Sequence, residues 1–151
     1  MFADLREFIQ KCKQEGELKK INGADWDLEL GVLTEVEAVG DNPSMLLFDN
    51  IVGYPSGYRV ADNLFAWPKR MAWILGFPHL GNVNDVAIIQ AWRERMKKGI
   101  KPIPPVEVTT GPIFENVHRG DEVNLFQFPV PKWHELDGGR YIGTGDLVIT
   151  R

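Results

Sequence analysis

Apolar positions in the first sixteen residues follow the spacing of a helix. Four of them recur at the i, i+3, i+4 and i+7 positions that line one helix face: Leu5, Phe8, Ile9 and Cys12. Asp4 before this run is suited to cap the helix, and Gly16 after it is suited to end it. The pattern predicts an amphipathic helix, followed by a short strand where Glu17–Ile21 alternates between polar and apolar residues.

A second helical pattern follows a turn at residues 22–25. Asp27 is predicted to cap this helix and Gly40 to end it. The apolar face that we expect to be buried comprises Leu28, Leu33, Val36 and Val39. A helix, a strand and a second helix in this order predict a mixed α/β layer.

The middle of the chain combines short apolar runs with two further helices. Met45–Phe48 is apolar throughout, long enough for a buried strand and too short for a helix. We expect a loop over residues 50–57 and another strand at Arg59–Ala61. Pro68 suits the first turn of a third helix, which Gly76 and Pro78 end. The last helix begins at Asn84 or Asp85 and ends at Gly99, with a repeating apolar face of Val86, Ile89, Trp92 and Met96.

A proline-rich spacer, Lys101–Pro105, follows the last predicted helix. Three prolines in five residues stiffen this segment, so we place the domain boundary there. Residues 1–100 are predicted to form a small N-terminal α/β domain. Residues 101–151 comprise the linker, a strand at Val106–Val108, a turn-rich run rich in proline and glycine, and a final strand over residues 146–150.

Composition and charge narrow the function classes. The chain has 151 residues, a net charge of −4 and 44% apolar content, which is typical of a globular protein. An acidic balance argues against nucleic-acid or anionic-membrane partners, and no apolar run approaches the roughly 18 residues of a membrane span. We therefore expect a cytoplasmic protein. Cys12, the only cysteine, excludes an internal disulfide and has the spacing of a core residue.

Few residues here could carry chemistry on their own. His134 and Glu135 are adjacent and would point in different directions on an extended backbone, so a shared metal is not expected. No glycine pattern of a Rossmann or P-loop phosphate site is present. Asp137-Gly138 is typical of a tight turn, and Trp133 is the one tryptophan that we would place near a cofactor.

The last third of the chain also carries a family resemblance. The run FPVPKWHELDGGRYIGTGDLVITR, preceded by GPIFENVHRGDEVNL, resembles the UbiD family of prenylated-flavin-dependent decarboxylases. The upstream segments DLREFIQKCKQEGELKKI and LLFDNIVGYP are similar to the N-terminal region of the same family. The resemblance implies a mixed α/β (α+β) fold in which the N-terminal domain is followed by the opening strands of a split-β-barrel flavin-binding domain. Enzymes of the family are roughly three times longer, so the chain is expected to be truncated relative to them.

The resemblance also implies specific site residues. In the family the threonine of the matching Gly-Gly-Arg-Tyr-Ile-Gly-Thr run faces the prenylated flavin, so Thr144 is expected to contact prenylated FMN, with Gly143 and Gly145 as small neighbours that permit close approach. A divalent cation, typically manganese, is implied, with its ligands outside this chain. The catalytic arginine and glutamates of the family are likewise expected elsewhere, so no catalytic residue is assigned here.

Three functions remain open from the sequence. The first is the N-terminal part of a carboxy-lyase that reversibly decarboxylates aromatic or α,β-unsaturated acids. We expect it to be inactive in isolation and to act with the remainder of the enzyme or a partner subunit as a homo-oligomer. The second is a non-catalytic assembly or accessory subunit of a split decarboxylase, since a final strand without a partner would favour pairing with another polypeptide. The third is a plain flavin-binding protein. The sequence does not distinguish the acid that is the substrate.

Overall fold

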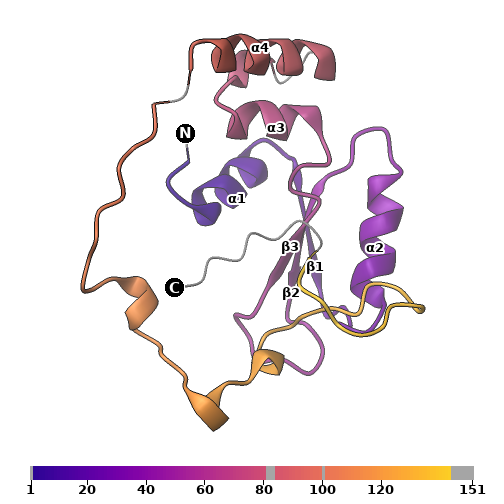
Figure 1. The fold of residues 1–151 in the computed structure, drawn as a ribbon. Helices are drawn as coiled ribbons and strands as arrows, with labels where there is room; N and C mark the ends of the chain where they lie inside the picture. The colour runs from indigo at the N-terminus through magenta and orange to yellow at the C-terminus, as the bar shows by residue number, and fades with distance from the viewer. Residues whose placement is uncertain (1, 81–83, 100, 144–151) are drawn as a thin grey trace.

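A three-stranded sheet with helices on both faces forms the centre of the protein (Figure 1). The computed structural model describes residues 2–80, 84–99 and 101–143. The helices and strands in these ranges are α1 (Leu5–Gln14), β1 (Leu18–Asn22), α2 (Glu29–Ala38), β2 (Met45–Asp49), β3 (Val60–Asp62), α3 (Pro68–Ile74) and α4 (Asp85–Lys97). Short 3-10 helices follow at Pro78–Leu80, Pro112–Phe114, Gly120–Glu122 and Leu125–Gln127. The mixed α/β architecture predicted from the sequence is confirmed.

Strand β2 is the centre of the sheet and of the core. It pairs parallel with β1, Leu18 opposite Met45, and antiparallel with β3, Leu47 opposite Ala61. Because side chains alternate along a strand, β2 buries residues on both faces. Met45 packs with Phe8, Cys12 and Trp73 beneath α1 and α3. On the opposite face Leu46 and Phe48 pack with Leu30 of α2, with Ala24 and with Ile51.

Helix α1 forms as its sequence pattern predicts. The Asp4 carboxylate accepts a hydrogen bond from the Glu7 amide at 2.9 Å, which satisfies one free amide of the first turn. The helix buries Phe8 and Cys12, and Gly16 follows its end at a φ of 71°. Burial raises the pKa of the Cys12 thiol to about 11, which keeps this thiol protonated and unreactive at neutral pH.

Helix α2 corrects two predictions. Asp27 is not its cap: the helix begins at Glu29 after Leu28, whose φ is 70°, and the Asp27 backbone forms a parallel bridge with Lys132 instead. The predicted buried face is right only in part: Leu33 packs against the core and Leu28 is half-buried, but Val36 and Val39 are exposed. The helix buries Leu30 and Gly31, and its half-buried residues include polar side chains with partners of their own.

Helices α3 and α4 lie together at one end of the sheet (Figure 1). Pro68 begins α3 as predicted, and Asn84 caps α4 by accepting from the Ala87 amide at 3.1 Å. The predicted face of α4 is wrong, because its four residues (Val86, Ile89, Trp92 and Met96) are all exposed. The helix instead contacts its neighbours through Ile88 and through Arg95, whose guanidinium lies 3.9 Å from the Phe77 ring centre.

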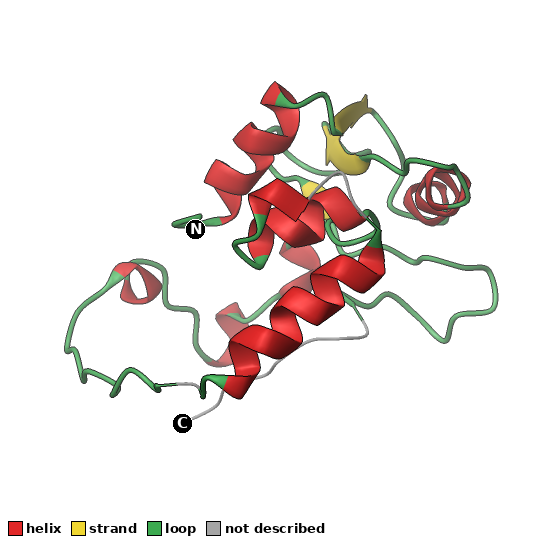
Figure 2. Ribbon diagram, turned by 90° about the horizontal axis from the view of Figure 1, so that it is seen from above, coloured by secondary structure: helices red, strands yellow, loops and turns green. Residues whose placement is uncertain are grey.

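The remaining residues form two segments that we name the arm, residues 101–125, and the strap, residues 126–143. Every arm residue is exposed except the half-buried Gly111. Figure 2 shows loops running outside the helices, and Figure 1 shows the arm leading away from α4 before the strap returns to the sheet. The strap contacts the N-terminal unit, which comprises the described residues up to 99. The boundary predicted between residues 100 and 101 stays a prediction.

The strand predicted at Val106–Val108 is wrong. Residues 106–108 have no strand partner within the described ranges, and a strand requires one for its backbone hydrogen bonds. The final strand predicted over residues 146–150 lies outside the described residues. No helix in the described part of the chain is long and apolar enough to cross a membrane.

Candidate functional site

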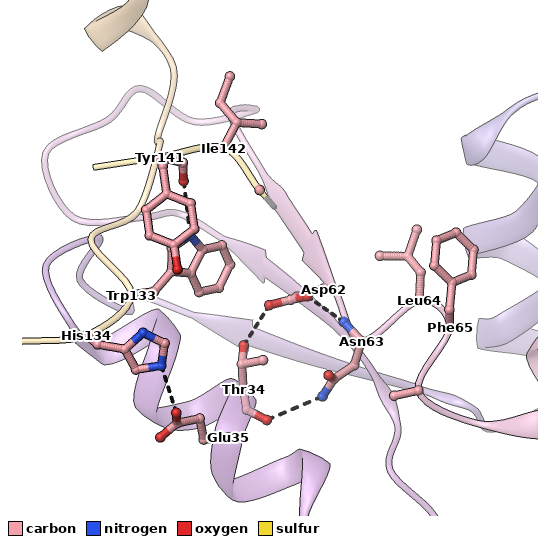
Figure 3. A pocket seen from close by; sticks show the side chains of 13 residues that line it. Thr34, Glu35, Asp62, Asn63, Leu64, Phe65, Trp133, His134, Tyr141 and Ile142 are labelled. Atoms are coloured by element: carbon pink, nitrogen blue, oxygen red, sulfur yellow. Dashed lines mark hydrogen bonds and ion pairs between the residues drawn. The ribbon is translucent and has the colours of Figure 1, made fainter. Parts of the chain in front are cut away.

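A cleft of about 710 Å³ lies between α2, the segment after β3, and the strap (Figure 3). Its lining residues come from three separate parts of the chain. They are Gly31, Thr34, Glu35, Asp62, Asn63, Leu64, Phe65, Ala66, Trp133, His134, Tyr141, Ile142 and Gly143. The site therefore exists only because the strap returns to the N-terminal unit.

The wall formed by α2 and the end of β3 is held by polar side chains. The Thr34 hydroxyl donates to the Asp62 carboxylate at 3.1 Å, and the same carboxylate accepts from the Asn63 amide at 2.7 Å. The Asn63 side chain donates back to the Thr34 carbonyl at 3.4 Å. Asn63 has a φ of 54°, which asparagine tolerates better than most residues. These bonds fix the direction in which the chain leaves β3.

The opposite wall is the strap, which docks through its backbone. The Leu28 amide donates to the Lys132 carbonyl at 2.9 Å, and the Lys132 amide donates to the Trp26 carbonyl at 3.0 Å. Gly31 allows this approach: a Cβ atom at that position would lie 1.9 Å from the carbonyl oxygen of Trp133. Only a residue without a side chain permits the strap to lie this close to α2.

Two aromatic side chains of the strap face the cleft. The Trp133 indole donates to the Tyr141 carbonyl at 3.0 Å, and the two rings lie 6.3 Å apart at a tilt of 50°. Burial, with the Asp137 carboxylate nearby, raises the pKa of the Tyr141 phenol, so this group stays protonated at neutral pH. Trp133 and Tyr141 form an aromatic side of the cleft next to Gly143 (Figure 3).

His134 links the strap to α2 at the edge of the cleft. Its Nε2 lies 2.7 Å from the Glu35 carboxylate, and its Nδ1 lies 3.5 Å from the Asp137 carboxylate. The His134 amide also donates to the Asp137 carboxylate at 2.8 Å, and the Asp137 amide donates to the His134 carbonyl at 3.2 Å, which closes a turn over residues 134–137. The tight turn was predicted just after this, at Asp137-Gly138, and the chain bends there at residues 138–139. Glu35 is 99 residues away in the sequence, so sequence spacing could not reveal this pair.

A buried arginine supports the cleft from behind. Arg70 of α3 is completely buried and donates to the Asn63 carbonyl at 2.9 Å, the Leu64 carbonyl at 3.3 Å and the Pro43 carbonyl at 2.7 Å. The Glu17 carboxylate accepts from it at 2.9 Å. Burial lowers the pKa of Arg70, an effect that Glu17 opposes, and a guanidinium remains charged. Sequence analysis missed this residue because an arginine within a helical pattern normally indicates an exposed position.

The cleft is suited to a flat, largely apolar group. One side is aromatic and contains a glycine, while the described lining residues include two carboxylates and neither lysine nor arginine. A phosphate or a carboxylate substrate would thus meet like charge there rather than a cation. The lining fits one edge of a ring system, and it does not fit the anionic end of a nucleotide cofactor.

Only one of the three predicted cofactor-contacting residues lies within the described part of the structure. Gly143 lines the cleft beside Ile142, and Thr144 and Gly145 lie outside the described residues. Trp133, which we would place near a cofactor, lines the cleft as well. The cofactor role of these residues stays a prediction. No group of three or more His, Cys, Asp or Glu residues within the described ranges is arranged to hold a metal ion.

Comparison with known families matches two successive parts of the chain. The 3-octaprenyl-4-hydroxybenzoate carboxy-lyase N-terminal domain matches residues 9–90. The Rift-related domain of the same carboxy-lyase matches residues 105–151. A pyrrole-2-carboxylic acid decarboxylase of Pseudomonas aeruginosa is 34% identical in an alignment 151 positions long, and the match covers 93% of this chain and 29% of that protein.

Solved structures share the fold. The vanillic acid decarboxylase ShVdcCD of Sedimentibacter hydroxybenzoicus, in its open form, has a TM-score of 0.75 and 29% identity, covering 92% of this chain and 30% of that one. The UbiD-class enzyme HmfF of Pelotomaculum thermopropionicum, in complex with FMN, has a TM-score of 0.66 and 22% identity, covering 90% of this chain and 28% of that one. The chain spans about 30% of the length of these relatives. With the N-terminal family domain matching more than half of its residues, this chain belongs to the UbiD family.

Proposed function

We propose that this chain forms the N-terminal part of a prenylated-FMN-dependent carboxy-lyase and supplies one edge of its cofactor site. The observation that carries this proposal is the docked strap, which brings Gly143 to an aromatic-sided cleft. Family membership supports the reaction class, since relatives are decarboxylases and an HmfF structure contains prenylated FMN. The reaction is reversible, non-oxidative loss of carbon dioxide from an aromatic or α,β-unsaturated acid.

In this proposal the residues of this chain help to bind and orient the flavin. Gly143 and its neighbours Thr144 and Gly145 approach the flavin, while Trp133 and Tyr141 exclude water from that edge. When bound, prenylated FMN supplies an electron sink for decarboxylation. As the family resemblance implies, we expect the phosphate, its divalent cation (manganese) and the substrate carboxylate to be bound by residues outside this chain. The described cleft lining contains neither lysine nor arginine, so it offers no positive charge to the two anionic groups.

The chain alone is expected to be inactive. Decarboxylation requires the acid to be oriented against the cofactor and a positioned acid to return the proton, and we expect the groups that do both to lie outside this chain. Loss of positioned acid–base groups costs on the order of 10² to 10⁴-fold, and loss of orientation costs more. The experiment is to assay carbon dioxide release from benzoic, cinnamic and heteroaromatic acids with prenylated FMN and manganese, using this chain alone and then a polypeptide that carries the complete family fold. Turnover by the 151-residue chain alone would contradict the proposal.

A second candidate is an accessory subunit that assembles with a partner without holding cofactor. The observation that favours it is the number of large apolar side chains left exposed on the arm, on α2 and on α4. The ShVdcCD structures also include a form with truncated ShVdcD, which indicates that a relative works with a second polypeptide. Flavin bound by the assembled protein, with its absorbance changed when Thr144 is replaced by tryptophan, would exclude this candidate and retain the enzyme.

A protein that binds flavin but releases no carbon dioxide in any assembly would be a plain flavin-binding protein. Homo-oligomerisation and a cytoplasmic location remain part of the main proposal.

A further inference from the structure

Arg140 of the strap lies against three aromatic rings. Its guanidinium carbon lies 4.0 Å from the centre of the Trp26 ring, 5.3 Å from Phe126 and 5.7 Å from Tyr54. Trp26 and Tyr54 belong to the loops after β1 and β2, and both pack on the buried cluster around Phe48. A cation against an aromatic face is attracted by the ring, most strongly for tryptophan. Arg140 therefore joins the strap to a rigid part of the N-terminal unit.

The same guanidinium closes the strap on itself. Its Nε donates to the Val130 carbonyl at 2.5 Å, and a terminal nitrogen donates to the Phe128 carbonyl at 3.4 Å and to the Tyr54 hydroxyl. Next to it the Tyr141 amide donates to the Pro131 carbonyl at 3.1 Å. Several donors in one plane are a property of arginine that lysine lacks. Arg140 thus connects the beginning and the end of the strap and holds both against Trp26.

We propose that Arg140 is a positioning residue that holds Gly143 at the cofactor edge of the cleft. Only Tyr141 and Ile142 lie between the two, and three Cα–Cα steps span at most roughly 10 Å along an extended chain, so the anchor of Arg140 limits where Gly143 can lie. This inference rests on the proposed function, because the position of Gly143 matters only if a cofactor binds next to it. The anchor lies in the N-terminal unit, which gives that unit a role in cofactor binding although its own residues need not touch the flavin.

The expected effect follows from the population of the docked strap. A binding site that is formed only part of the time binds its ligand more weakly by that fraction. If the strap without Arg140 is docked about one tenth of the time, the apparent Kd for flavin rises about tenfold. Arg140→Lys should give a smaller loss than Arg140→Met, because lysine keeps the charge over Trp26 and loses the planar set of donors.

The experiment compares three variants with the wild type. Arg140→Met and Arg140→Lys test the anchor, and Arg119→Met, at an exposed arginine of the arm, is the matched control. Hydrogen exchange of the Tyr141 and Lys132 amides is measured in the 151-residue chain. The Kd for FMN is measured by fluorescence titration in the polypeptide that carries the complete family fold, together with thermal unfolding.

We expect faster exchange of the Tyr141 amide and an FMN Kd about tenfold higher in Arg140→Met, an intermediate result in Arg140→Lys, and no change in Arg119→Met. Unchanged Kd in Arg140→Met, or a rise that merely follows global unfolding, would overturn the inference while the proposed function stands. A wild-type protein of complete fold that binds neither FMN nor prenylated FMN would overturn the proposed function, and this inference with it.

Discussion

The arm and the strap are consecutive segments of similar composition, but only the strap docks on the N-terminal unit. Both contain prolines and large apolar side chains, and neither contains an α-helix or a strand of the sheet. The arm leaves Ile103, Val106 and Ile113 more than three quarters exposed, whereas the strap buries Pro129 and Pro131 and half-buries Trp133. The strap docks because its partners are shaped for it: backbone groups at residues 26–28, the bare surface at Gly31, and the Trp26 ring under Arg140.

Apolar content alone therefore does not bring an irregular segment onto a folded unit. An ordered residue loses conformational freedom, and that loss must be offset by specific contacts. The strap has backbone hydrogen bonds, a close approach and a stacked arginine, each with a named partner on the N-terminal unit. The arm offers apolar side chains without such a partner in the described part of the chain.

The largest effect is expected from a substitution that destabilises the unit on which the strap docks. Arg70→Met removes a buried charge that bonds to Glu17 and to three backbone carbonyls, and should lower the free energy of unfolding by about 3 kcal/mol. Urea unfolding followed by tryptophan fluorescence measures the change. Arg6→Met is the control, since the Arg6 side chain is 87% exposed. A loss of less than about 1 kcal/mol would show that Arg70 does not hold the unit together.

A second change separates the strap from an intact unit. In Gly31→Ala the new methyl group would overlap the Trp133 carbonyl, so the strap must move away while α2 itself gains about 1 kcal/mol of helix propensity. We expect exchange of the Leu28 and Lys132 amides to accelerate about tenfold, equivalent to ~1.4 kcal/mol of local opening. Gly138→Ala is the matched control, because a Cβ there meets nothing within 4 Å. Unchanged exchange in Gly31→Ala would mean that the strap adapts without undocking.

Acid pH should weaken the unit through Glu37. Partial burial alone would raise the pKa of this carboxyl, but hydrogen bonds from Lys19 and Ser44 outweigh it and the pKa is lowered. A carboxyl with a depressed pKa in the folded state contributes stability above its unfolded pKa, near 4.3, and that contribution is lost as pH falls further. Glu37→Gln should therefore reduce stability at pH 7 by up to about 1 kcal/mol and have less effect at pH 3.

Unfolding curves of the wild type and of Glu37→Gln at the two pH values measure this difference. Glu122→Gln, at an exposed position of the arm, is the control and should show no such dependence. An equal destabilisation of Glu37→Gln at both pH values would contradict an ionic contribution from Glu37.

The smallest effect is expected in the arm, where substitution should not matter to this chain. Ile113→Ser should change the free energy of unfolding by less than about 0.5 kcal/mol, because Ile113 is 80% exposed. Ile51→Ser, at a position 2% exposed, is the matched comparison and should cost several times more. Limited proteolysis should likewise cut first within the arm. Early cleavage inside α2 would show that the N-terminal unit, rather than the arm, is the less stable region.

Most helices and strands of the N-terminal unit follow from local features of the sequence. The cap at Asp4, the apolar run of β2 and the proline that begins α3 each act through local backbone chemistry, which is why the pattern predicted them. Motif resemblance identified the family, and the family comparisons confirmed it. The wrong predictions were the Asp27 cap, the strand at Val106–Val108, the buried face of α4 and part of that of α2. The spacing of apolar residues shows which face of a helix could be buried. The elements that pack against the helix determine which face is buried in the folded chain.

The assembly of the cleft could not be predicted from the sequence. Its walls join Thr34 to Asp62, Glu35 to His134 and Gly31 to Trp133, pairs that lie between 28 and 102 positions apart. Arg70 and Arg140 hold those walls through hydrogen bonds to backbone carbonyls, and a carbonyl is present at every residue. A bond of that kind leaves no trace in the choice of partner residue. The residues that form the cleft therefore show no distinctive pattern in the sequence, and only folding brings them together.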